Sequence, residues 1–122
     1  WYCSPATRRV PVHHGSQTGL SLAAYALARA QEIHGPSCGA AALLPVLLRN
    51  LRWWRDERLV DGLVAIEHPY ETGMDDLRRF EDELEPFLAV DATSYLAVNA
   101  AATAELALAA GERAAEVEAR AI

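Results

Sequence analysis

Apolar residues recur at three- and four-residue spacing in three long segments of this chain, and this helical period is the feature that most limits its fold. The segments are residues 17–34, 43–54 and 92–110. Such spacing places apolar side chains along one face of a helix, and that face must then be buried against another element. No segment alternates apolar and polar residues over a useful length, as a half-buried strand does. The sequence therefore predicts an all-α class.

Residues typical of helix ends flank the first and third segments. Gly35 can end the first helix, and Gly111 can take the left-handed conformation that often follows a helix. At the start of the third helix, Asp91 or Thr93 can serve as the side-chain cap. These positions predict two well-bounded helices.

The second segment contains a proline and ends in turn-like sequence. Because Pro45 has no amide hydrogen to donate and is favoured in the first turn of a helix, we expect a short helix to about residue 43 and a main helix from Pro45. Residues 55–63 read as a turn, with Asp61-Gly62 as a tight-turn dipeptide. Residues 63–66 can form a short extended piece.

Size and charge exclude several classes of function. The chain has 122 residues, which fits one domain, and a formal net charge of −6. All 11 basic residues are arginines, and they form no basic stripe with interleaved aromatic residues, so we expect no nucleic-acid partner. No run of about 18 apolar residues is present, so no membrane partner is expected either.

The two cysteines, Cys3 and Cys38, are compatible with one disulfide but do not require it. Two free thiols in a reducing compartment is the simpler interpretation. We therefore expect a cytoplasmic protein.

Residues 68–76 are too polar for a core and too rich in specific chemistry for a linker. Their sequence is His68-Pro69-Tyr70-Glu71-Thr72-Gly73-Met74-Asp75-Asp76. Three carboxylates crowded into so short a stretch disfavour one another's charge, and such crowding raises the pKa of a carboxyl that must donate a proton. If the protein has an active site, part of it lies here.

The sequence around this stretch resembles the acid-bearing region of trehalase-like glycoside hydrolases, which fold as an (α/α)6 barrel. The resemblance is carried by Trp54, Arg55-Asp56, Asp61-Gly62-Leu63, Ile66 and then residues 68–75. The branch it is most similar to holds mannosylglycerate hydrolases, glucosylglycerate hydrolases and processing α-glucosidases. Tyr70 stands where that branch usually has tryptophan, and Asp76 where it usually has asparagine.

This resemblance implies hydrolysis of an α-glycosidic bond in a small glucoside or mannoside, with inversion. It makes Asp75 the general acid, and Glu71 a residue that holds sugar hydroxyls or tunes Asp75. Gly73 lets the backbone approach the ligand, and Tyr70 offers a flat ring to a sugar. Asp76 completes the expected substrate-binding set. The partner is then a small carbohydrate, with no cofactor and no metal.

The resemblance also implies that residues 1–122 are a single partial domain, part of an (α/α)6 toroid with two helical hairpins joined by a long acidic active-site loop. The chain starts at Trp1 and stops at Ile122 within a helical pattern, as a piece of a longer protein would. We expect the second catalytic carboxylate beyond Ile122 and an inactive isolated chain. The expected macromolecular partner is the remainder of the barrel, or a second copy bound through exposed apolar helix faces.

Other interpretations remain open at this point. The residues able to bind metal are His13, His14, His34, His68, Cys3 and Cys38, but their spacings match no zinc pattern. The chain could instead be a non-catalytic all-α interaction module, although its halves do not align as repeats. Trp53 and Trp54 could stack on sugar, yet their helical position favours core packing for at least Trp54.

Overall fold

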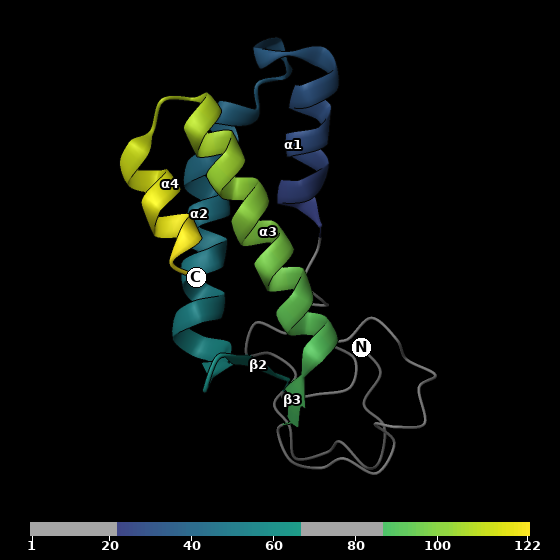
Figure 1. Cartoon of the computed structure of the whole chain (residues 1–122), viewed down its shortest axis with the longest axis vertical. Helices are drawn as coiled ribbons and strands as arrows, with labels where there is room; N and C mark the ends of the chain where they lie inside the picture. The colour runs from purple at the N-terminus through teal and green to yellow at the C-terminus, as the bar shows by residue number, and fades with distance from the viewer. Residues whose placement is uncertain (1–21, 67–86) are drawn as a thin grey trace, which may run out of the picture.

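The computed structural model describes residues 22–66 and 87–122, and the fold is a bundle of helices closed at one end by a small sheet (Figure 1). The helices in chain order are α1 (Ala23–His34), the one-turn 3-10 helix η2 (Pro36–Cys38), α2 (Ala40–Arg58), α3 (Val90–Ala109) and α4 (Arg113–Arg120). Two helical hairpins, α1 with α2 and α3 with α4, therefore lie on either side of the sheet in the sequence. The predicted helical class is confirmed, with the sheet as an addition to it.

The two glycines predicted at helix ends both follow a helix and both have a positive φ. Gly35 follows α1 with a φ of 73°, and Gly111 follows α3 with a φ of 76°. The predicted side-chain cap of α3 is wrong. Ala89 is the cap residue, without a side-chain hydrogen bond, and the Thr93 hydroxyl donates backward to the Ala89 carbonyl.

The predicted break of the second helix at Pro45 is also wrong, because α2 is continuous from Ala40 to Arg58. A proline inside a helix removes the amide that would bond the carbonyl four residues earlier, here that of Ala41. Both residues are exposed, so solvent can supply the missing donor. The same helix also takes in residues 55–58, which were expected to begin a turn.

Helix α3 is the centre of the bundle and packs against α1, α2 and α4. Its most deeply buried alanines are Ala100, Ala102, Ala104 and Ala107, each at most 5% exposed. Small side chains allow helices to approach closely on several sides of α3. From α2, the predicted apolar stripe contributes Leu44, Leu48, Leu51 and Trp54 to the same core.

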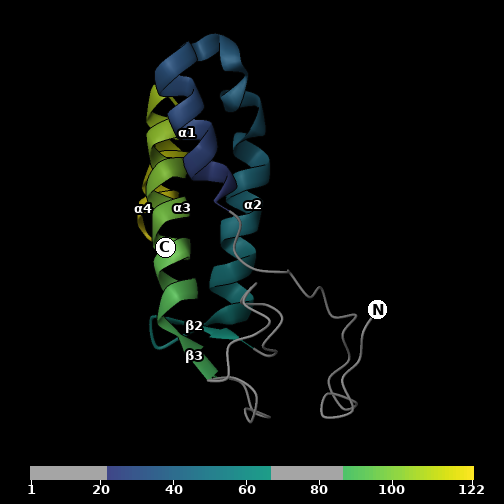
Figure 2. The same ribbon diagram turned by 90° about the vertical axis from the view of Figure 1, so that its right-hand side faces the viewer.

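The sheet lies across the end of α2 and the start of α3, as both views show (Figures 1 and 2). Its strands β1 (Leu59–Val60), β2 (Leu63–Ile66) and β3 (Phe87–Ala89) are antiparallel and follow one another in that order. Asp61, with a φ of 50°, and Gly62, with a φ of 80°, form the tight turn between β1 and β2. The predicted turn and the extended piece at 63–66 are confirmed. The sequence did not predict that they would form a sheet.

Candidate functional site

The residues expected to carry the chemistry lie outside the described residues, and their roles remain predictions. They are Tyr70, Glu71, Gly73, Asp75 and Asp76, with His68 just before them. The structure does describe both sides of that segment. Ile66, the last residue of β2, is the register partner of Phe87, the first residue of β3. The described residues on either side of positions 67–86 are therefore paired in one sheet.

Strand β2, which ends at Ile66, packs against the core of the bundle. Val64 and Ile66 point inward and are 0% and 1% exposed, whereas Leu63 and Ala65 are partly exposed. Alternation of this kind fixes the register, since a slip by one residue would turn the buried pair outward. The sheet thus places Ile66 and Phe87, the described residues next to segment 67–86, on the helical bundle.

Thr93 links this sheet to helix α3. Its Oγ1 accepts a hydrogen bond from the Val64 amide at 2.9 Å and donates one to the Ala89 carbonyl at 2.7 Å. Val64 and Ala89 are register partners in β2 and β3. One hydroxyl on the first turn of α3 therefore bonds both strands beside segment 67–86.

Two tryptophans and an arginine form the end of α2 nearest the sheet. Trp54 is 1% exposed, and its ring meets that of Trp53 edge to face, with centroids 5.0 Å apart. The guanidinium of Arg58, a residue only 4% exposed, lies 5.4 Å from the Trp53 ring centre. The core position predicted for Trp54 is confirmed. Trp53 is half-buried and already contacts a ring and a cation, an arrangement that stabilises the end of the helix.

Arg55 and Asp56 belong to the same motif and form an ion pair on the outside of α2. Arg55 Nε lies 2.6 Å from Asp56 Oδ1, and the side chains are 39% and 55% exposed. The hydrogen bond from Arg55 lowers the pKa of Asp56 from its ordinary value. Asp56 is therefore a carboxylate near neutral pH, which does not suit the role of proton donor.

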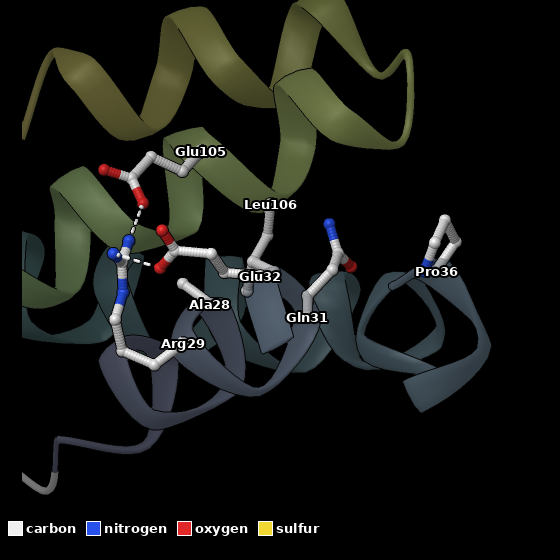
Figure 3. Close-up of a pocket in the computed structure, with 7 residues that line it drawn as sticks. All are labelled: Ala28, Arg29, Gln31, Glu32, Pro36, Glu105 and Leu106. Atoms are coloured by element: carbon white, nitrogen blue, oxygen red, sulfur yellow. Dashed lines mark hydrogen bonds and ion pairs between the residues drawn. The ribbon is translucent and has the colours of Figure 1, made fainter. Parts of the chain in front are cut away.

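A surface hollow of about 470 Å³ lies between α1 and α3 (Figure 3). Arg29 reaches across it and binds Glu32 and Glu105, with nitrogen to oxygen distances of 2.6 Å in both pairs. The charged groups that line this hollow therefore pair with one another. Sequence reasoning did not single out these residues, since Arg29 and Glu105 are 76 positions apart and only the packing of α1 on α3 joins them.

Within residues 22–66 and 87–122, no group of three or more histidine, cysteine, aspartate or glutamate side chains could hold a metal ion. In the same ranges, none of the helices has both the length and the hydropathy needed to cross a bilayer. Cys38 is a half-buried free thiol, while Cys3 lies outside the described residues.

The chain matches the protein family described as "Mannosylglycerate hydrolase MGH1-like glycoside hydrolase domain" over residues 4–122. This match spans both described parts and the segment between them. No curated protein and no solved structure matches the chain. The family match confirms the resemblance found in the motif, and with it a glycosidase type of function. The chain belongs to the mannosylglycerate hydrolase MGH1-like family of glycoside hydrolase domains.

Proposed function

We propose that the protein hydrolyses an α-glycosidic bond in a small glucoside or mannoside, with inversion at the anomeric carbon. The single observation that carries this proposal is the family match, which covers the acidic stretch together with the helices around it. Inverting hydrolysis needs a protonated carboxyl for the leaving oxygen and a carboxylate that activates water on the opposite face of the sugar. Asp75 is the proposed proton donor, and the opposing base lies outside this chain.

The remaining acidic-stretch residues bind the sugar in this proposal. Glu71 accepts hydrogen bonds from sugar hydroxyls or raises the pKa of Asp75 through its negative charge, and Asp76 adds to both effects. Tyr70 presents its ring face to the sugar. Gly73 allows close approach of the backbone.

The described residues on either side of segment 67–86 are held together by the sheet. General acid catalysis requires the acid to stay close to the bond that breaks. A displacement of the acid by about 1 Å can lower the rate about a hundredfold. Segment 67–86 is attached at Ile66 and Phe87, which are paired, and Val64 beside them is fully buried. The chain that carries the proposed acid therefore continues from a paired strand of the bundle.

We further propose that the chain forms part of an (α/α)6 barrel and is inactive without the rest of it. Several large apolar residues are more than half exposed in the described part: Ile33 at 74%, Val90 at 72%, Leu108 at 56% and Val117 at 55%. The remaining helices of the domain are the proposed cover for these faces. Sedimentation should show that the isolated chain associates, and a monodisperse monomer at high concentration would contradict this part of the proposal.

The proposal is tested by Asp75→Asn in the complete protein that contains this chain. An amide has no acid proton to give, so kcat on an alkyl α-glucoside or α-mannoside should fall by about 10²- to 10⁴-fold. Asp76→Ala is the neighbouring comparison, and it should raise KM more than it lowers kcat, because the proposed role of Asp76 is binding. Turnover of Asp75→Asn at the wild-type rate would reject Asp75 as the acid.

A further inference from the structure

Helix α3 is apolar on its exposed side as well as on its buried sides. Figure 1 shows α2 behind α3, with α1 and α4 to either side, and α3 packs against all three. A further strip of its surface, here called the outer stripe, is exposed and consists of Val90, Ser94, Ala97, Val98, Ala101 and Leu108. A helix that is apolar all round is normally covered on every side, so the outer stripe needs an occupant.

We propose that two copies of this chain pair through the outer stripe, with their α3 helices antiparallel. The inference deepens the association proposed above for the isolated chain, and in this sense it rests on the proposed function. In the complete protein the remaining helices of the proposed barrel cover this stripe, and in the isolated chain a second copy takes their place.

The outer stripe is complementary to itself when it is reversed. Val90 and Leu108, which are 72% and 56% exposed, lie nine positions on either side of Asn99, and Ala97 and Ala101 lie two positions on either side. A two-fold axis level with Asn99 therefore sets Val90 against Leu108 of the second copy, and Ala97 against Ala101 of the second copy. Small residues at the middle let the two backbones approach, and the larger residues fill the space where crossed helices diverge.

The charges beside the outer stripe also favour the antiparallel arrangement. In α3, all of which the structure describes, Glu105 is the only exposed charged residue, and Arg29 of the same copy binds it at 2.6 Å. In the proposed pair each Glu105 lies six positions from the axis, so the two are about 18 Å apart along the helices, at about 1.5 Å per residue. Exposed charges at that separation are largely screened. A parallel pair would instead bring the two Glu105 carboxylates side by side.

The first experiment measures self-association of residues 1–122 by sedimentation equilibrium. One helix face is smaller than a standard interface, so we expect a weak dimer with a Kd of about 10–100 µM. Ala101→Arg places a charge in the apolar middle of the stripe and should raise this Kd at least about tenfold. Ala42→Arg is the matched control, because Ala42 is an exposed alanine on α2, and it should leave the Kd within about twofold. Both variants should keep the helical circular dichroism of wild type.

The second experiment tests the register by disulfide cross-linking, in a background that carries Cys3→Ser and Cys38→Ser. A disulfide requires Cα atoms within about 7 Å of each other. We therefore expect a mixture of the Ala97→Cys and Ala101→Cys chains to form cross-linked dimers on mild oxidation at least about fivefold faster than either variant alone. In a parallel pair, each variant would cross-link with itself and the mixture would gain nothing.

The inference is overturned if Ala101→Arg associates as wild type does, or if Ala42→Arg weakens association equally. Either result would move the interface to another face and leave the proposed association standing. Faster cross-linking within each cysteine variant than in their mixture would overturn the antiparallel pairing. A wild-type chain that stays monomeric would refute both the proposed association and this inference. If Ala101→Arg loses helical circular dichroism, the two cysteine variants decide the question, since they replace alanine by a side chain of similar size.

Discussion

Two parts of the bundle are held together by opposite means. At the sheet end, single specific side chains fix the structure: the buried Trp54, the hydroxyl of Thr93 and the inward residues of β2. In the alanine-packed part of α3, the structure depends instead on the smallness of many side chains. Those residues are Ala100, Ala102, Ala104 and Ala107.

This difference predicts opposite sensitivities to substitution. Where one large side chain fills the space, truncation leaves a cavity that the surroundings close only in part. Where helices meet through methyl groups, truncation removes little, and enlargement forces the helices apart.

The largest effect is expected from Trp54→Ala at the sheet end. Trp54 is 1% exposed, and loss of a fully buried indole should destabilise the chain by about 3–5 kcal/mol. Urea unfolding followed by circular dichroism measures this change. Trp53→Ala is the neighbouring control and should cost less, because Trp53 is only partly buried. An equal loss of unfolding free energy in Trp54→Ala and Trp53→Ala would contradict the view that the buried Trp54 is the more important of the two for stability.

A smaller loss should follow from enlargement within α3. Ala104 is 0% exposed, so Ala104→Leu must overpack the contacts of α3 and should cost about 1–3 kcal/mol. Ala101 lies on the same helix but is exposed, and Ala101→Leu should change stability by less than about 0.5 kcal/mol. The same unfolding measurement applies. If the two leucine variants were equally stable, α3 would not depend on small side chains.

The smallest effect is expected at the ion pair between α2 and α4, which lies at the surface. Arg52 Nε is 2.5 Å from Glu118 Oε1, and the hydrogen bond from Arg52 lowers the pKa of Glu118 below its ordinary value of 4.5. A carboxylate whose pKa is lower in the folded state stabilises the fold above its unfolded pKa, and this contribution is lost as pH falls through the folded pKa.

Arg52→Gln should therefore lower the melting temperature slightly at pH 7, and the difference from wild type should shrink as pH falls below 4.5. Arg49→Gln is the control, because Arg49 is exposed on the same helix and the pair with Glu118 is made by Arg52. A difference that grew toward acid pH would contradict the assigned role of Glu118.

The helices were predictable from sequence because their signals are local. Periodic leucines and alanines define the buried faces, and Gly35 and Gly111 mark helix ends through their backbone freedom. Pro45 misled the prediction, since packing of the α2 stripe outweighs the loss of one hydrogen bond on an exposed face. The turn at Asp61-Gly62 was also visible in two adjacent residues.

The sheet and the links around it were not predictable in this way. Strands of two to four residues are too short to show a period, and β3 is separated from β2 by residues 67–86. The sequence predicted Thr93 as a helix cap because it lies near the start of α3. In the structure its hydroxyl accepts a hydrogen bond from the amide of Val64, 29 positions away. The site residues, including Asp75, were identified only through their resemblance to the family motif, and their roles stay predictions.

The central claim, that Asp75 protonates the leaving oxygen, is tested most directly by changing the leaving group. A fluoride departs with little need of a proton, whereas an alkoxide needs one. In the complete protein, Asp75→Asn should hydrolyse an α-glycosyl fluoride within about tenfold of wild type and an alkyl glycoside of the same sugar at least about a hundredfold more slowly. An equal loss on both substrates, or no loss on either, would contradict the account.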